Sequence, residues 1–401
     1  MDNIQLLTSL KVPADSKVLL LVMDGLGGLP GPKGLTELEA ASTPNLDALA
    51  SKGAVGLMDP VRRGITPGSG PGHLGLFGYD PLTTLIGRGA LEAAGIGFDL
   101  QRIDVPMRFN FCTLDSDGNI TDRRAGRIAT ELNAKLVEKM RTVKVPGVEI
   151  FVETVKEHRG IAVFRREGLH GNLHDTDPQR LGVQPLKARA TDDVSQEMAD
   201  IANTWLDGIH DALKDDSPAN GILTRGWCNY PHIPTYQDAF GLNPACIALY
   251  PMYRGVAQFA GMKIYTEGIT DFATKLNVLA NVWGDHDFFF FHYKHTDSSG
   301  EDGAFDRKVV CIEEVDKALP CIMDLKPDVI AITGDHSTPA MYSAHSWHPV
   351  PVLLAGKYVR PDNVTVFGER AAATGGLGRF DAHYLMNEML AAAGKITKYG
   401  A

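Results

Sequence analysis

The chain of 401 residues exceeds the usual size of one hydrophobic core, so two domains are expected. With 44% hydrophobic and 22% charged residues, its composition is that of a soluble globular protein. The formal net charge of −10 argues against a nucleic-acid partner, which would favour a basic surface.

The first predicted strand is the apolar run from Lys17 to Met23, which is short and bounded by polar residues. Such a run is typical of a strand buried on both faces. Asp24 follows it directly, at the strand end where open α/β sheets bind their ligands. A helix is expected from Pro44, after the capping residues Ser42 and Thr43, to Gly53.

Glycines surround Ser69 in the stretch from Thr66 to Asp80. A serine in a glycine-rich turn that leads into a helix could be an exposed nucleophile, with backbone N–H groups directed at an anion. An ordinary turn is the alternative for Gly-Ser-Gly taken alone. His73 would share the helix face of Ser69, where it could assist proton transfer or simply be a packed histidine.

The pattern changes between about 105 and 220. A strand is predicted over 109–114, a turn at 117–119, a helix ending near Met140, a strand pair over 148–154 and 160–164, and a long helix over 192–213. Antiparallel strands combined with helices indicate an α+β unit. We therefore expect a discontinuous domain of residues 1–104 and 220–401, with residues 105–219 as an inserted smaller domain.

Short buried strands alternate with helices in the last part of the chain, which is typical of a parallel α/β sheet. The expected strands are 222–226, 246–250, 288–293 and 329–333, with helices around 254–260, 271–283 and 304–319.

Metal-ligand residue types follow two of these strands. Asp297 and Glu301 come after 288–293, Asp335 and His336 come after 329–333, and His345 lies shortly beyond. Each alone could be a helix cap or a turn. Together with Asp24 they mark one sheet edge, which predicts a site for hard cations such as Mg²⁺ or Mn²⁺, extended by histidine to Mn²⁺ and Zn²⁺.

These motifs occur together in one known family. The blocks VMDGLGG, TPGSGPGHLGLFGYDP, DRRAGRI, KHTDSSGED, TGDHSTPA and HSWHPVPVLL, in this order, closely match it. The sequence resembles the cofactor-independent phosphoglycerate mutases, in the archaeal-type branch of the alkaline phosphatase superfamily. The resemblance implies an alkaline-phosphatase-like α/β fold, with a mostly parallel sheet flanked by helices and an inserted α+β domain.

The resemblance also implies a function. A metal-dependent isomerase would interconvert 2- and 3-phosphoglycerate through a phosphoserine at Ser69, in glycolysis and gluconeogenesis. Asp24, Asp335 and His336 with Ser69 resemble the ligands of one divalent metal, and Asp297 and His345 those of a second. Glu301 stands where the family usually has histidine and is retained as a ligand, which favours Mn²⁺ or Mg²⁺ over Zn²⁺. The alternative function is a phosphomonoesterase or phosphonate-cleaving hydrolase of the same superfamily.

Arginines of the inserted region are suited to bidentate binding of carboxylate and phosphate. A solvated or salt-bridged arginine is the alternative at each position. The candidates for binding a small phosphorylated substrate, besides His73, are Arg123, Arg124, Arg127, His158, Arg159 and Arg225.

The cellular compartment is inferred from the cysteines. The chain contains five, without CxxC spacing, and this pattern predicts reduced thiols in a cytoplasmic protein. No signal pattern or membrane-length apolar run is recognised, so no membrane partner is expected. The sequence is compatible with a homo-oligomer as well as with a monomer.

Overall fold

The computed structural model describes residues 1–400 and separates into two compact units. The larger unit combines Met1–Thr84 with Ile233–Ala401, and the smaller one is Leu85–His232. The smaller unit extends past the expected 105–219 on both sides. One reason is that α5 (Arg88–Gly95) packs on β3 (Asp104–Leu114), the first strand of this unit.

An eight-stranded sheet organises the larger unit, in the order β13-β2-β12-β11-β1-β10-β8-β9. The central strand β1 (Val18–Met23) runs parallel to β10 (Phe288–Tyr293) on one side and to β11 (Val329–Thr333) on the other. All three are fully buried and mostly apolar, as a strand covered on both faces requires. This mixed α/β fold with a mostly parallel sheet confirms the predicted fold class.

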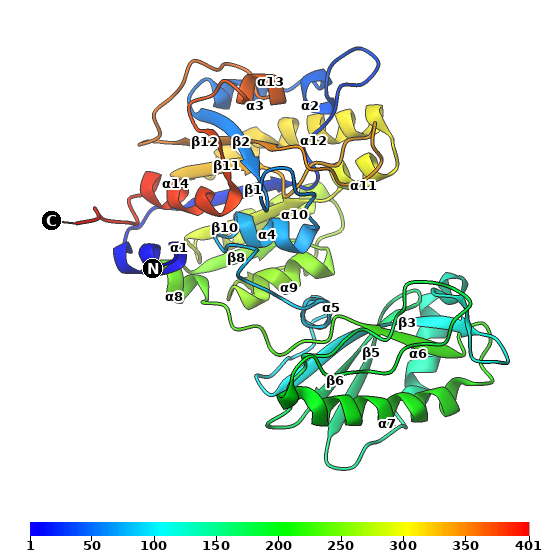
Figure 1. The fold of residues 1–401 in the computed structure, drawn as a ribbon. Helices are drawn as coiled ribbons and strands as arrows, with labels where there is room; N and C mark the ends of the chain where they lie inside the picture. The colour runs from blue at the N-terminus through cyan, green and yellow to red at the C-terminus, as the bar shows by residue number, and fades with distance from the viewer. Residues whose placement is uncertain (401) are drawn as a thin grey trace. The chain divides into compact units, whose positions relative to one another are not determined.

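Helices cover both faces of this sheet (Figure 1). On one face, Leu19 and Leu21 pack in a core with apolar residues of α3, α10 and α12. On the other, Phe290 contacts Phe77 at the end of α4, and Phe288 contacts Tyr236 of α8. The remaining elements of this unit are α1 Asn3–Leu10, α2 Glu37–Ala40, α3 Pro44–Ala50, β2 Ala54–Asp59, α4 Ser69–Leu76, α8 Tyr236–Phe240, β8 Pro244–Ile247, α9 Pro251–Phe259, β9 Lys263–Ile264, α10 Phe272–Val282, α11 His295–Glu301, α12 Phe305–Met323, β12 Val350–Gly356, α13 Glu369–Ala372, β13 Gly378–Asp381, η3 Ala382–Tyr384 and α14 Leu385–Ala392.

The smaller unit is built on a five-stranded antiparallel sheet, in which β3 pairs with β4, β6 and β7. Its core lies between the sheet and the helices α6 and α7, around residues such as Phe109, Phe164 and Trp205. Its other elements are β4 Ile120–Asp122, η1 Ala125–Arg127, α6 Thr130–Met140, β5 Glu149–Lys156, β6 Arg159–Arg165, η2 Asp193–Ser195, α7 Gln196–Leu213 and β7 Gly221–Arg225.

For one predicted strand, the expected sheet was wrong. The segment 222–226 is expected in the parallel sheet, but β7 pairs antiparallel with β3 in the smaller unit, with Ile222 opposite Phe111. A short apolar run bounded by turns has the same pattern in either kind of sheet, so periodicity alone could not assign it.

Candidate active site

Three strand ends of the large sheet bring acidic residues and histidine together. Asp24 follows β1, and Asp335 and His336 follow β11; all three side chains are fully buried. Nε2 of His336 lies 3.4 Å from Oδ1 of Asp24 and 3.2 Å from Oδ2 of Asp335. One ligand atom from each residue therefore falls within the span of a single metal ion.

A second group lies beside the first. Asp297, buried in α11 after β10, has Oδ1 3.7 Å from Nε2 of His345. Oε1 of Glu301 lies 3.8 Å from the same nitrogen, although 55% of the Glu301 side chain is exposed. The rings of His336 and His345 stack with their centroids 3.6 Å apart, so the two groups are contiguous.

The buried carboxylates have few hydrogen-bond partners. Among the described residues, neither oxygen of Asp24 and not Oδ2 of Asp335 forms a hydrogen bond of good geometry, although Nε2 of His292 and Nζ of Lys294 lie 3.2 and 3.1 Å from Oδ2 of Asp24. Burial and the negative charges of Asp24 and Asp297 raise the pKa of Asp335 well above its ordinary value. Buried carboxylate charge that is only partly compensated is costly, and a divalent cation would reduce that cost. These oxygens and the two imidazoles therefore fit divalent metals.

Ser69 is the first residue of α4 and is partly exposed. Its Oγ lies 3.2 Å from Nε2 of His336, so it adjoins the group of Asp24, Asp335 and His336. The close approach depends on Gly72, where a Cβ atom would lie 2.3 Å from the carbonyl oxygen of Asp335.

His73 lies behind the serine. Nδ1 of its fully buried ring donates to the carbonyl oxygen of Ser69 at 2.8 Å and lies 3.2 Å from Oδ2 of Asp335. The ring stacks on Tyr253, and burial lowers the pKa of His73 to about 4. These contacts are typical of a packed histidine, which was one of the two roles expected for His73. They also connect the backbone of Ser69 to the carboxylate of Asp335.

Lys294, which no motif in the sequence singled out, bridges the two groups. Its Nζ lies 2.5 Å from Oδ2 of Asp297 and 3.1 Å from Oδ2 of Asp24, and it donates to the hydroxyl of Tyr253. Together with His292, it holds the pKa of Asp24 well below the usual range, against the opposing effect of burial. Its position at the end of an apolar strand, three residues before Asp297, is the signal that could have identified it.

In the smaller unit, basic residues converge on one sheet face. Arg225 of β7 lies opposite Arg108 of β3, and Arg159 of β6 lies opposite Asn110. Residues paired across strands share a face, and positions 108 and 110 share it as well. Burial lowers the pKa of Arg108; Glu92 opposes this effect, whereas Arg88, Arg159 and Arg225 add to it.

The acidic partners of these arginines are unevenly distributed. Arg225 lies 3.5 Å from Asp175 and 3.8 Å from Asp177. Arg108 forms an ion pair with Glu92, with both side chains largely buried, yet its Nε has no hydrogen-bond partner. Nε of Arg159 is likewise buried without a partner among the described residues. Neither Arg108 nor Arg88 was predicted as a site residue. Arg108 lies within a mostly apolar strand, and Arg88 is the first residue of an ordinary helix.

The remaining basic candidates have different environments. Arg123 forms a two-point ion pair with the buried Asp177, as a structural arginine would. Arg124 and Arg127 are exposed beside a left-handed turn in which Ala125, Gly126 and Arg127 all have positive φ. Strain of this kind often marks functional segments. Burial and the charges of Arg159, Arg124 and Arg108 lower the pKa of the buried His158 to about 4, while Glu157 opposes the shift.

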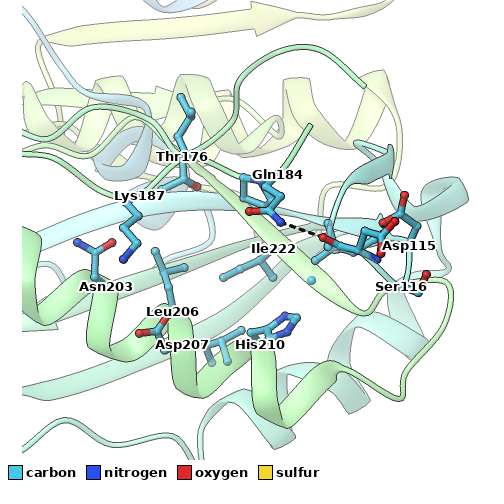
Figure 2. A pocket seen from close by; sticks show the side chains of 17 residues that line it. Asp115, Ser116, Thr176, Gln184, Lys187, Asn203, Leu206, Asp207, His210 and Ile222 are labelled. Atoms are coloured by element: carbon cyan, nitrogen blue, oxygen red, sulfur yellow. Dashed lines mark hydrogen bonds between the residues drawn. The ribbon is translucent and has the colours of Figure 1, made fainter. Parts of the chain in front are cut away.

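A separate pocket of about 490 Å³ lies in the smaller unit, between the turn 115–118, the segment 184–187 and α7 (Figure 2). Gln184 donates to the carbonyl oxygen of Asp117 across one end. Its charged or titratable residues are all exposed, and no arginine lines it; they are Asp115, Asp117, Lys187, Asp207 and His210. The pocket therefore lacks the partly buried guanidinium groups found on the sheet face of Arg108, Arg159 and Arg225.

Comparison with known proteins covers the whole chain. Residues 50–220 match the family described as 2,3-bisphosphoglycerate-independent phosphoglycerate mutase. Proteins named as probable members of that family are 50% identical in Thermus thermophilus and 48% identical in Deinococcus radiodurans, over 100% of both chains in each case.

Two solved structures also match. The PH0037 protein from Pyrococcus horikoshii is 32% identical with a TM-score of 0.83, covering 98% of this chain and 100% of the other. The cofactor-independent phosphoglycerate mutase from Thermoplasma acidophilum is 30% identical with a TM-score of 0.75, covering 94% and 100%. Within residues 1–400, no helix is both long and apolar enough to traverse a membrane.

Proposed function

Because the chain belongs to the family of 2,3-bisphosphoglycerate-independent phosphoglycerate mutases, which are isomerases, we propose that it interconverts 2- and 3-phosphoglycerate. The observation that carries the proposal is the contact between Oγ of Ser69 and the group of Asp24, Asp335 and His336. In such a site a hydroxyl becomes a nucleophile for phosphorus. The reaction would serve glycolysis and gluconeogenesis in the cytoplasm.

Two divalent cations would be held by the two groups of side chains. Ser69, Asp24, Asp335 and His336 would hold one, and Asp297, Glu301 and His345 the other. Mn²⁺ or Mg²⁺ suits this carboxylate-rich set, with Zn²⁺ as the alternative. When bound, such ions stabilise negative charge on phosphoryl oxygens and lower the pKa of a nearby hydroxyl.

The transfer has two halves. In the first, Oγ of Ser69 forms a bond to phosphorus, loses its proton, and the bond from phosphorus to the C2 or C3 oxygen of the substrate breaks. That oxygen gains a proton, which leaves glycerate and a phosphoserine. In the second, the other hydroxyl of the retained glycerate attacks the phosphoserine and restores Ser69. The net reaction consumes neither water nor a second substrate.

Retention of the glycerate distinguishes a mutase from a phosphatase. We assign this role to the smaller unit, in which Arg108, Arg159 and Arg225 share one sheet face and Arg159 has no acidic partner among the described residues. Guanidinium groups bind carboxylate and phosphate by paired hydrogen bonds. Arg124, Arg127 and His158 are further candidates for substrate contact, whereas Arg123 is already paired with Asp177.

An assay with 3-phosphoglycerate and Mn²⁺ tests the proposal. Formation of 2-phosphoglycerate is followed through enolase, and free phosphate is measured in the same samples. We expect 2-phosphoglycerate with little phosphate. Phosphate release at a comparable rate would instead identify a hydrolase of the same superfamily.

A further inference from the structure

On the basis of the two-metal chemistry proposed above, we propose that Thr338 is a positioning residue. Its single hydroxyl sets the tautomer of His336 and the orientation of Asp297, so that it connects the two groups of metal ligands. Thr338 is not itself a candidate ligand, and its role is independent of which phosphorylated substrate the enzyme takes.

The contacts of this hydroxyl are short and fully buried. Oγ1 of Thr338 lies 2.7 Å from Oδ1 of Asp297 and 2.9 Å from Nδ1 of His336. Thr338 and His336 have no exposed surface, and Asp297 has 1%. Water therefore cannot replace either bond without rearrangement of the site.

The direction of each bond follows from the chemistry of the groups. A carboxylate can only accept, so the one hydroxyl proton of Thr338 goes to Asp297. The oxygen of Thr338 is then an acceptor towards His336, whose Nδ1 must carry a proton to donate. In the neutral ring, Nε2 is therefore left with its lone pair.

This tautomer determines which metal His336 can bind. By distance alone the ring belongs to either group, since its nitrogens lie near Asp24 and Asp335 on one side and near Asp297 on the other. Because Nδ1 is engaged by Thr338, only Nε2 can coordinate. Nε2 faces Asp24, Asp335 and Ser69, so the bond to Thr338 assigns His336 to their group.

Backbone hydrogen bonds and close packing around Thr338 fix the position of this hydroxyl. Its N–H donates to the carbonyl oxygens of Gly25 and Gly27, in the loop that follows Asp24. Its own carbonyl oxygen accepts from Nζ of Lys308, a lysine with no exposed surface. Gly25 has φ +63°, and a Cβ there would lie 2.6 Å from Oγ1 of Thr338. The hydroxyl is thus fixed from three segments of the chain.

The tautomer can be read directly in the metal-free protein by ¹⁵N NMR of labelled histidine, with the His336 signal assigned through a His336→Asn variant. We expect a protonated Nδ1 in the wild type and in Thr338→Ser, which keeps the hydroxyl. Thr338→Val has nearly the same shape but offers no acceptor. Its ring should shift to the Nε2–H form, which can donate to Asp335 or Asp24.

Affinity for Mn²⁺, measured from the signal of free Mn²⁺ in electron paramagnetic resonance, gives a second readout. Loss of a hydrogen bond to a metal-ligating histidine typically weakens binding about 10- to 100-fold, which is expected for Thr338→Val but not for Thr338→Ser. Thr333→Val is the matched control. It removes another buried threonine hydroxyl, which donates to the carbonyl oxygen of Pro351, and should leave the affinity unchanged.

Two results would overturn the proposal: an unprotonated Nδ1 in the wild type, or the same tautomer and Mn²⁺ affinity in Thr338→Val as in the wild type. Neither readout uses phosphoglycerate. A protein without mutase activity could still pass both tests, so failure of the proposed function and failure of this inference are distinguishable.

Discussion

Arg108 of β3 lies directly opposite Arg225 of β7, so two like charges face each other across an antiparallel strand pair. Such a pair destabilises a sheet unless an anion lies between the charges. Diagonally across the same face, Arg159 has no ion-pair partner among the described residues. Arg108 has Glu92 as an acidic partner, and Arg225 has Asp175 and Asp177. Arg159 therefore supplies the unpaired positive charge that a site for an anionic substrate requires.

The arginine face can be tested with two substitutions in one strand. Arg159→Met removes a cation without an ion pair, so stability should be unchanged or higher, while KM for 3-phosphoglycerate should rise about 10-fold or more, equivalent to about 1.5–3 kcal/mol for a charged hydrogen bond. Steady-state kinetics and urea unfolding measure the two effects.

Arg165→Met is the matched control, because Arg165 also lies in β6 but is bound to Asp104 at 2.7 Å. The Arg165→Met variant should have a lower free energy of unfolding and an unchanged KM for 3-phosphoglycerate. The same rise in KM for both variants would argue against a specific role for Arg159.

Ser69→Ala should lower turnover by at least about 1,000-fold, because the substitution removes the atom to which phosphorus is transferred. The fold should persist, since the hydroxyl is partly exposed. Labelled substrate should mark the wild-type protein at Ser69 and leave the variant unlabelled. Turnover close to that of the wild type would exclude Ser69 as the nucleophile.

Removal of divalent metal should lower the thermal stability of the protein, because the buried Asp24 and Asp335 then have only Lys294 and neighbouring histidines to offset their charge. At a metal concentration of 100 times Kd, binding contributes about 2.7 kcal/mol. Calorimetry with a chelator, and after restoring Mn²⁺, measures the shift. In Asp335→Asn the metal-free protein should be more stable than the metal-free wild type, and added metal should have little effect.

His158 should make stability depend on pH. Its pKa of about 4 in the folded protein lies below the value near 6.5 of an unfolded chain. Between these values the unfolded state binds more protons, so stability falls as the pH falls from about 6.5 towards 4. His158→Gln cannot titrate, and its stability relative to the wild type should therefore rise between pH 7 and pH 5 in urea unfolding. A difference independent of pH would contradict the expected environment of His158.

The sheet of the larger unit was predictable because its central strands are unusual. Runs such as Leu19–Met23 and Phe288–Phe291 are apolar on both faces, and few other structures accommodate them. Parallel strands of one sheet end at the same edge, so Asp24, Asp297 and Asp335 were expected to lie near one another once their strands were assigned to one parallel sheet. The pairing of β7 with β3 could not be predicted in this way, because strand pairing depends on residues far apart in the sequence.

The sequence could not predict residues whose role depends on a single contact. Thr338 is two positions from His336, but nothing in the pattern indicates that its hydroxyl also reaches Asp297. Arg108 is enclosed between apolar neighbours of β3, where an arginine is easily taken for a solvated one. Its partners Arg159 and Arg225 lie 51 and 117 positions away, so their convergence required the register of the strands.

The sheet order has a consequence for biosynthesis. β1 leaves the ribosome early, but its neighbours β10 and β11 are encoded more than 260 residues later. At about 5–20 residues per second, this strand waits roughly 15–60 s for its partners. The smaller unit can complete its own sheet during that interval, whereas the apolar Val18–Met23 segment stays without both of its sheet neighbours.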